Sequence, residues 1–325
     1  MNHPNLHGVE PQRVVQVIKD RKARGYNPRS DDDGRKLALV VEGGAMRGVT
    51  SAGGALALSR LGYSHAFDEA FATSAGCMNV AYLLTDQANT GILVYLDLCT
   101  RGRFIRPWRF WKILDVDWLY DRAIPGENTL GAERLRAHPT TMVVAMNDND
   151  HGTPFVIEVQ NHPEPPMRIF KAAAAIPVFY NRTVTLDGVR CSDGGLLNPF
   201  PLRTAIERGC TDILVLLSRP AGYVREAVSR FQSITYRLLA GRGHPVRKQL
   251  LDDYPAVDRS IRELAFGKGA VPDGVRIATF TTDGLPAVPP TCSDTDLLWT
   301  AADQYGRNVL TVFDGDHEML QIPHA

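Results

Sequence analysis

Ser74 lies in a segment whose residue types suit a nucleophilic serine. Residues 71–77 read Phe-Ala-Thr-Ser-Ala-Gly-Cys, after a short apolar run and before a helix-like run. Small neighbours such as Ala72, Ala75 and Gly76 allow the tight strand-to-helix turn that pushes a serine hydroxyl out at the top of a sheet. The segment therefore predicts a nucleophile elbow at Ser74, although so short a match is weak when it stands alone.

A glycine-rich segment upstream could hold the oxyanion that such a serine generates. It follows the apolar run Leu37 to Val41 and opens a helix-like run. In that geometry successive backbone N–H groups point outward, and the helix N-terminus adds partial positive charge. The residues of this candidate oxyanion loop are Gly43, Gly44, Ala45, Met46, Arg47 and Gly48. Alone, the segment could also bind a phosphate or be a plain tight turn, but it matches neither common nucleotide-loop pattern.

Asp193 is the candidate base. It follows the expected strand Val184 to Arg190 and precedes Gly194 and Gly195, which places a carboxylate on a tight turn at a strand end. A partly desolvated carboxylate that is hydrogen-bonded to a serine can accept its proton. Taken alone, the Asp-Gly pair could be only a turn. The rival base is His317, the one histidine whose order along the chain resembles that of an α/β-hydrolase triad.

Strands that alternate with helices must position these groups. Continuous apolar runs indicate strands buried on both faces, as in a parallel sheet. The order predicts a three-layer α/β/α sandwich with a mostly parallel central sheet. Expected strands are 37–41, 70–73, 141–146, 153–159, 184–190, 212–217 and 274–280, and expected helices are 11–24, 49–61, 77–84, 167–176, 201–208 and 295–312. A hairpin is expected across residues 147–152.

One catalytic domain accounts for most of the chain. Residues 1–34 are expected to form a short helix and a flexible acidic connector, and residues 35–325 the hydrolase domain, with 221–325 as helical cover and a last strand. The aromatic and basic segment Arg101 to Asp121 could be a lid, a peripheral membrane contact or ordinary packing. A pair of amphipathic helices is expected over Ala221 to Gly267.

The composition of the 325-residue chain is that of a soluble globular protein. The formal net charge is zero, which gives no general affinity for nucleic acid. Five scattered cysteines without CxxC spacing favour a reducing compartment and neither a disulfide framework nor a zinc site. The N-terminal segment lacks the apolar run of a signal peptide. We expect a cytoplasmic protein, at most peripheral at a membrane, that needs no metal or cofactor.

Together, three of these segments resemble the patatin-like phospholipase family. Residues 43–48 are similar to its oxyanion loop and residues 72–76 to its G-x-S-x-G elbow. Residues 193–195, with the Ala-rich and Pro-rich segments on either side, are similar to its D-G-G/A block. The resemblance implies a patatin-type sandwich, a Ser74–Asp193 dyad without histidine, and hydrolysis of acyl esters such as phospholipids.

Two residues depart from the family pattern. Ala72 replaces the first glycine of the elbow, and Ala45 replaces a glycine of the loop. An alanine at a position with positive φ would be strained, which would reduce activity. The alternatives to the dyad enzyme are therefore a catalytically weak lipid-binding or regulatory protein on the same fold, and an esterase with a Ser-His-Asp triad. Arg47 is expected to brace the loop, meet a phosphate or be solvated, and Cys77 to be a packing residue.

Overall fold

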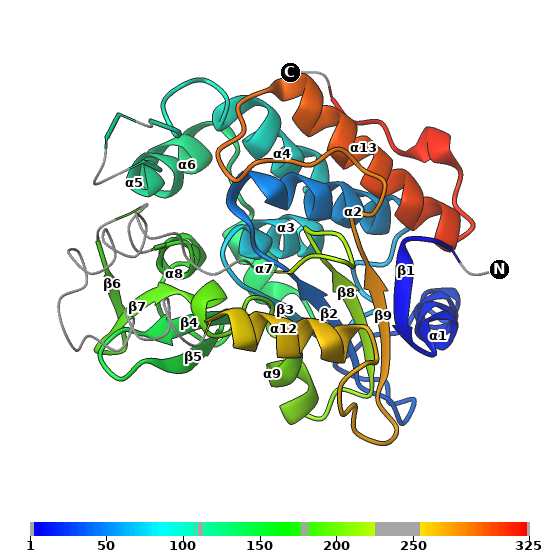
Figure 1. The fold of residues 1–325 in the computed structure, drawn as a ribbon. Coiled ribbons are helices and arrows are strands. Elements are labelled where there is room, and N and C mark those ends of the chain that lie inside the picture. Colours follow the sequence, from blue (N-terminus) through cyan, green and yellow to red (C-terminus); the bar gives the residue numbers. More distant parts are fainter. Residues whose placement is uncertain are drawn as a thin grey trace.

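A single mixed sheet runs through the centre of the protein. The computed structural model describes residues 3–106, 108–109, 113–176, 180, 182–224 and 254–323. The strands of these residues follow the order β1-β9-β8-β2-β3-β4-β7-β6, and β5 pairs with β4 (Figure 1). They are β1 (Leu6–Val9), β2 (Leu37–Val41), β3 (Glu69–Ala72), β4 (Thr141–Asp148), β5 (Thr153–Glu158), β6 (Val184–Leu186), β7 (Val189–Asp193), β8 (Asp212–Leu216) and β9 (Arg276–Phe280).

Parallel pairing occupies the middle of the sheet and antiparallel pairing its edges. The neighbours β9-β8, β8-β2, β2-β3 and β3-β4 are parallel. The strand β1 pairs antiparallel with β9 at one edge, and β5, β7 and β6 add antiparallel pairs at the other. Since the carboxyl ends of parallel strands lie at one edge of the sheet, the loops after β2 and β3 meet there.

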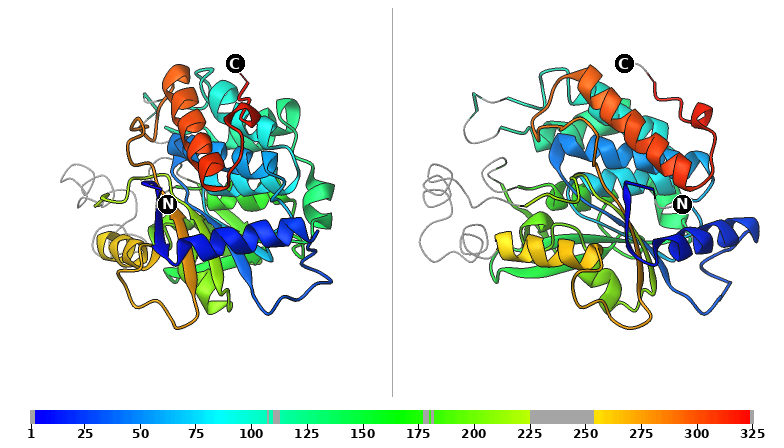
Figure 2. Two further views of the ribbon diagram at one scale, coloured as in Figure 1. Left: turned by 90° about the vertical axis from the view of Figure 1, so that its right-hand side faces the viewer. Right: turned by 45° about the vertical axis from the view of Figure 1, so that its right-hand side comes forward.

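Helices cover both faces of the sheet. They are α1 (Pro11–Ala23), α2 (Gly48–Arg60), α3 (Ala75–Leu84), α4 (Ala88–Leu93), α5 (Val116–Trp118), α6 (Ile124–Glu127), α7 (Ala132–Ala137), α8 (Pro166–Ala173), α9 (Leu202–Glu207), α12 (Tyr254–Ala265) and α13 (Thr295–Val312). Short 3-10 turns cover Ala45–Arg47, Gly194–Leu196 and His317–Met319, and π-helical turns cover Val94–Leu98 and Leu119–Ala123. Figure 2 shows α13 and α12 on opposite sides of the sheet.

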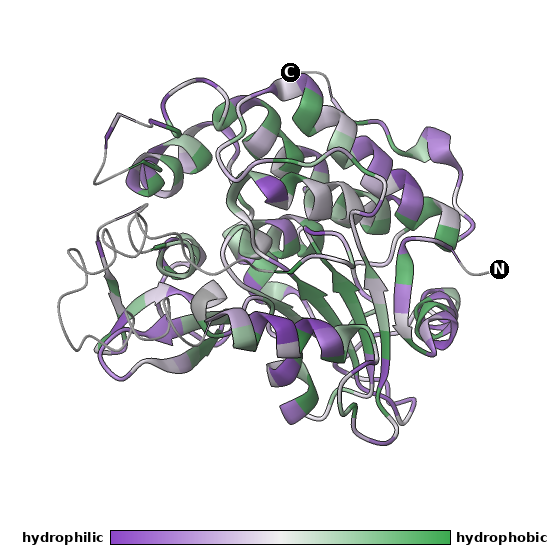
Figure 3. Ribbon diagram, in the orientation of Figure 1, coloured by the Kyte–Doolittle hydropathy of each residue, from purple (hydrophilic) through white to green (hydrophobic). Residues whose placement is uncertain are grey.

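Alternating side chains of β2 divide the core into two layers. Leu37, Leu39 and Val41 pack in the larger cluster, which contains apolar residues of α2, α3 and α13. Ala38 and Val40 pack in the other cluster, with residues of α9 and α12. Figure 3 shows the corresponding concentration of hydrophobic residues on the central strands. The predicted three-layer sandwich is therefore confirmed, and β2 is buried on both faces as its unbroken apolar run predicted.

The expectation of one strand over residues 184–190 is wrong. The chain forms a hairpin there, β6 and β7, in which Leu186 pairs with Val189. The two turn residues, Asp187 and Gly188, both have positive φ, at 49° and 79°. An Asp-Gly pair with two positive φ angles is a favoured tight hairpin turn. Because of this reversal, β7 runs on to residue 193, so Asp193 ends a strand antiparallel to β4.

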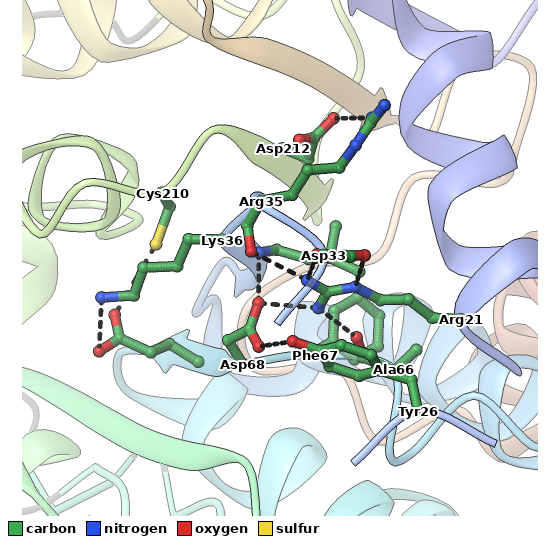
Figure 4. Close-up of polar contacts among 12 residues, drawn as sticks. Arg21, Tyr26, Asp33, Arg35, Lys36, Ala66, Phe67, Asp68, Cys210 and Asp212 are labelled. Atoms are coloured by element: carbon green, nitrogen blue, oxygen red, sulfur yellow. Dashed lines mark hydrogen bonds and ion pairs between the residues drawn. The ribbon is translucent and has the colours of Figure 1, made fainter. Parts of the chain in front are cut away.

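Buried contacts fix the N-terminal segment that the sequence predicted as a flexible connector. The fully buried side chain of Arg21 on α1 bonds Asp33 and Asp68, with 2.7 Å between nitrogen and oxygen in each pair (Figure 4). Its guanidinium also donates to the carbonyl oxygen of Arg35. Since Asp68 accepts a hydrogen bond from the amide of Leu37, this network ties the connector to the start of β2.

The C-terminal third supplies cover for both faces. The predicted strand at 274–280 and the predicted helix at 295–312 are present as β9 and α13. Of the two helices expected over 221–267, the second is observed as α12, and residues 225–253 lie outside the described part of the chain. None of the helices among the described residues has the length and apolar character that would let it span a bilayer.

Candidate active site

Ser74 occupies a sharp turn between β3 and α3. Its backbone has φ 53° and ψ −133°, a conformation that non-glycine residues rarely adopt. The turn ends the buried strand at Ala72 and starts the helix at Ala75. Ser74 is only 5% exposed, so the surrounding structure holds this strained residue in place. The predicted strand–serine–helix elbow is thus present in the fold.

The glycine-rich loop lies directly against this turn. A Cβ atom placed on Gly43 would be 2.6 Å from the Cβ of Ser74 and 2.9 Å from the carbonyl oxygen of Thr73. Distances this short are impossible for any side chain, so only glycine allows the two backbones to approach. Residues 43–48 follow β2, whose neighbour in the sheet is β3. The parallel pairing therefore brings the loop and the serine together.

The carboxyl group of Asp193 lies close to Ser74, whose hydroxyl favours the charged form of the carboxyl and so lowers its pKa. One of its oxygens, Oδ1, also accepts a hydrogen bond from the amide of Gly195 at 2.7 Å. Asp193 is 5% exposed, and burial raises the pKa of its carboxyl to about 6, although the nearby Ser74 hydroxyl and the Gly195 amide lower it and oppose the shift. A carboxylate with a pKa near neutrality can both accept and return a proton.

The backbone of Asp193 is held from two sides. Its N–H donates to the carbonyl oxygen of Ala175 at 3.1 Å, and its carbonyl oxygen accepts from Nδ2 of Asn147 at 2.8 Å. Asn147 is fully buried on β4. The sequence analysis assigned this residue only to a hairpin loop. An uncharged amide directly after the apolar run of residues 142–146 was the available signal, because a buried amide requires a hydrogen-bond partner.

The structure narrows the choice of oxyanion donors. Met46 donates its amide hydrogen to the carbonyl oxygen of Pro290, and Arg47 donates to Gly44. These two amides, and that of Gly48 at the start of α2, are therefore engaged within the protein. For the remaining loop residues, Gly43, Gly44 and Ala45, and for Ala75 after the serine, the described part of the chain shows no acceptor. Of the predicted loop residues, Gly43, Gly44 and Ala45 thus have N–H groups free to donate to a bound group, as does Ala75.

A buried ionic cluster supports the loop from behind. Glu42 is 1% exposed and accepts hydrogen bonds from the amide of Ser218 at 2.7 Å and from Arg219 at 3.0 Å. Arg262 of α12 bonds the same carboxylate. Burial alone would raise the pKa of Glu42, but Arg262, Arg219 and the Ser218 amide lower it to about 2. The hydroxyl oxygen of Ser218 lies 2.8 Å from the carbonyl oxygen of Gly43, which links the cluster to the loop.

The comparisons with known proteins agree with this arrangement. A model of the patatin-like phospholipase family matches residues 39–206, about half of the chain, including Ser74, Asp193 and the loop. The chain belongs to this family. The uncharacterized protein YjjU of Escherichia coli strain K12 is 26% identical over 192 residues, which cover 57% of this chain and 53% of YjjU. The chain thus spans about half the length of that relative.

Among solved structures, the chain is similar to VipD from Legionella pneumophila. The match covers 86% of this chain and 67% of the VipD chain, with 12% identity and a TM-score of 0.40. The patatin-like domain assigned by the family model begins in β2 and ends in α9. It therefore contains β3, β4 and β7, the elbow, the Asp193 turn and the loop.

The two alanines that depart from the family pattern differ in their backbone. Ala45 has φ 52°, in the left-handed region that favours glycine. Ala72 is the last residue of β3, fully buried, and is absent from the residues with positive φ. The expectation of a strained backbone is therefore confirmed at Ala45 and is wrong at Ala72. The first position of the elbow is an ordinary strand position, where alanine costs nothing.

An apolar pocket opens beside Ser74. Its volume is about 50 Å³, and its walls come from the oxyanion loop, α3, the Val94–Leu98 turn, residues 104–120 and the chain after α8. The lining residues are Ala45, Met46, Ser74, Ala75, Met78, Val94, Tyr95, Cys99, Phe104, Leu114, Val116, Leu119, Tyr120, Ala174 and Ile176. Five apolar side chains of the Arg101 to Asp121 segment thus line the pocket at the serine: Phe104, Leu114, Val116, Leu119 and Tyr120. Trp108, 67% exposed, points to solvent.

His317 lies at the opposite end of α2 from the serine. Gly315, two residues before it, packs against Leu61 just after the C-terminus of α2, whereas Gly48 at the N-terminus packs against Ala75. A helix of 13 residues is about 20 Å long. His317 is exposed and shares a 2.8 Å hydrogen bond with Thr311. It cannot act as the base for Ser74 in this structure.

The remaining candidates for chemistry are inert. Cys77 is fully buried, and burial together with the nearby Asp193 raises the pKa of its thiol well above the usual value. The thiol is a packing group, as expected. All five cysteines are free and buried. Within the described ranges, no three or more His, Cys, Asp or Glu side chains are grouped so that they could hold a metal ion.

Proposed function

We propose that the protein hydrolyses acyl esters of lipids through a Ser74–Asp193 dyad. The observation that carries the proposal is the proximity of the strained, buried Ser74 to the buried carboxyl of Asp193, whose pKa the serine hydroxyl influences. Membership of the patatin-like phospholipase family supports lipid esters as the substrate class. The apolar pocket beside the serine suits an acyl chain. A phospholipase A or lysophospholipase type of cleavage fits these features.

The reaction takes place in two steps with one proton carrier. Ser74 Oγ attacks the ester carbonyl carbon while its proton passes to Asp193. The negative oxygen of the tetrahedral intermediate accepts hydrogen bonds from the amides of Gly43 to Ala45 and of Ala75, each typically worth roughly 3 kcal/mol. The C–O bond to the leaving alcohol breaks, and Asp193 returns the proton to that alcohol. Asp193 then takes a proton from the water that attacks the acyl carbon, and it returns this proton to Ser74 Oγ as the C–O bond to the serine breaks and the fatty acid leaves.

A fluorophosphonate probe and three variants test this proposal. We expect labelling of the wild type at Ser74, no labelling of Ser74→Ala, and loss of ester hydrolysis in Ser74→Ala and Asp193→Asn. His317→Ala should keep full activity. Folded wild-type protein that is neither labelled nor active would instead favour a lipid-binding or regulatory protein on the patatin-like fold. Full activity in Asp193→Asn would eliminate the dyad.

A further inference from the structure

A second, larger cavity lies beside the apolar pocket and is strongly basic. Its volume is about 590 Å³, within the size range of small-molecule sites. It lies between the segment of residues 103–122 and α8, and Figure 1 shows α5 and α8 on the same side of the molecule. Its cationic lining residues are Arg103, Arg106, Arg109, Arg122, Lys171 and Arg182. Such a cavity is suited to an anionic group.

The acidic residues of this basic cavity do not balance its cations. Among the described residues, three aspartates line it, Asp115, Asp117 and Asp121, against six cations, which leaves a net charge of +3. Each aspartate already bonds a lining cation. Lys171 Nζ lies 2.8 Å from Asp117 and 2.6 Å from Asp121, Arg182 lies 3.3 Å from Asp117, and Arg109 lies 3.4 Å from Asp115.

Three arginines are left over for a ligand. Among the described residues, Arg103, Arg106 and Arg122 form no ion pair. The Nε atom of Arg106 is buried and has no hydrogen-bond acceptor there. A buried guanidinium N–H without an acceptor costs free energy, which a bound anion would recover. Guanidinium groups bind phosphate in a bidentate manner, so this set fits a phosphate group.

One segment separates the basic cavity from the pocket at Ser74. Phe104, Leu114 and Val116 line the apolar pocket, whereas the adjacent residues Arg103, Asp115 and Asp117 line the basic cavity. The same change of side occurs after α8, where Lys171 lines the cavity and Ala174 the pocket. The pocket and the cavity are therefore adjacent, and a single segment of the chain separates them. A single small lipid could extend from one to the other around the edge of that wall.

We propose that the basic cavity binds the anionic phosphate headgroup of the ester that is cleaved at Ser74. This inference rests on the proposed function, since it assigns the substrate class of the same site. The preferred substrates are then acyl esters with a phosphomonoester headgroup. Neutral acylglycerols lack the phosphate, and a headgroup that ends in a quaternary ammonium would bring a cation to a site that is already positive.

The test compares two esters that differ only in the phosphate. The substrates are a 1-acylglycerol 3-phosphate and the 1-acylglycerol with the same acyl chain, and the measured quantity is the ratio of their kcat/KM values. We expect a ratio of at least about tenfold in favour of the phosphate ester, because hydrogen bonds between guanidinium groups and a charged phosphate are stronger than those between neutral groups. The double variant Arg103→Gln/Arg122→Gln should lose most of this ratio. Arg134→Gln, an exposed arginine of α7 outside the cavity, should keep it.

The outcomes separate the inference from the function on which it rests. A wild type that is labelled by fluorophosphonate but cleaves both esters equally, or a ratio unchanged in the double variant, would overturn the headgroup site and leave the hydrolase intact. An unlabelled wild type would overturn the hydrolase instead. Calorimetry of Ser74→Ala with inorganic phosphate provides the last arm. Phosphate binding that depends on Arg103 and Arg122, without any preference for the phosphate ester, would mean a free-phosphate site and would also overturn the proposal.

Discussion

The hydroxyl of Ser74 lies close enough to the carboxyl of Asp193 to lower its pKa, although the two residues are 119 positions apart in the sequence. Ser74 follows β3 and Asp193 ends β7, and β4 lies between these two strands in the sheet. Asp193 can reach the serine because β7 runs antiparallel to β4 and its end turns back at Gly194. A Cβ atom on Gly194 would be 2.4 Å from the carbonyl oxygen of Ala145, so this turn requires glycine.

Replacing Asp193 with asparagine should remove activity and raise stability. Burial raises the pKa of Asp193 from 3.8 to about 6, so ionising this carboxyl at neutral pH costs up to about 3 kcal/mol. Asparagine keeps the shape and is uncharged. We expect the free energy of unfolding at pH 7.5 to increase by about 1–3 kcal/mol, with a loss of kcat of at least about a thousandfold.

Urea denaturation at two pH values checks this prediction. The folded carboxyl keeps its proton between about pH 4 and pH 6 while the unfolded one has lost it, so the wild type loses stability as pH rises through this window. The gain from Asp193→Asn should accordingly vanish at pH 4. Asp273→Asn, at an exposed position, is the matched control. A gain that is equal at both pH values would contradict the origin assigned to it.

The pH dependence of hydrolysis should follow Asp193. Only the ionised carboxylate can accept the Ser74 proton, so kcat/KM should increase with pH and level off above about pH 6. A plot of log kcat/KM against pH should have a slope of about one below this value. His317→Ala should leave the profile unchanged. An apparent pKa near 7 that disappears in a histidine variant would identify a different base.

The sequence predicted the parallel core of the fold because its signals are local. The unbroken apolar run Leu37 to Val41 indicates a strand buried on both faces, and β2 is such a strand. The same reasoning failed at Val184 to Arg190, where the Asp187-Gly188 turn was overlooked. It also missed β1, whose four residues join the sheet only through pairing with β9. Pairing between segments far apart in the chain has no local signal.

The candidate site could be predicted in its residue types and not in its supporting contacts. Ser74 and Asp193 stand in short motifs with small neighbours. Glu42 and Asn147 have no such motif, and their roles depend on partners from distant segments, such as Arg262 for Glu42. The hydrogen bond from the Met46 amide to the carbonyl oxygen of Pro290 could not be predicted either, because residue 290 belongs to a distant loop after β9.

Ala45 and Ala72 should respond in opposite ways to replacement by glycine. Ala45 has φ 52°, where alanine costs roughly 1–2 kcal/mol, so Ala45→Gly should keep or raise stability by up to about 1 kcal/mol. Ala72 is buried at the end of β3, and Ala72→Gly removes a methyl group and adds backbone entropy. We expect it to lower stability by about 1–2 kcal/mol.

Thermal denaturation and the rate of fluorophosphonate labelling measure both effects. Labelling of Ala45→Gly should be at least as fast as that of the wild type, since the loop gains a residue suited to its conformation. Labelling of Ala72→Gly should not be faster, because the elbow has no strain at this position. Faster labelling of Ala72→Gly would mean that its backbone does limit the reactivity of Ser74.

The narrow apolar pocket should restrict the length of the acyl chain. Its volume of about 50 Å³ is far below the roughly 150 Å³ of a cavity that accommodates benzene, so short acyl chains should fit best. Phe104, 6% exposed, forms part of its wall. Phe104→Ala should increase kcat/KM for p-nitrophenyl octanoate relative to the butyrate by about tenfold. The longer chain can then bury additional methylene groups, and each buried methylene contributes roughly 0.8 kcal/mol.

Truncating a buried phenylalanine costs about 3–5 kcal/mol of stability, so Phe104→Leu serves as the milder variant. Phe313→Ala, which removes a buried ring that packs on Tyr63 outside the pocket, controls for destabilisation and should leave the ratio unchanged. An equal ratio in the Phe104 and Phe313 variants would show that the acyl chain binds elsewhere.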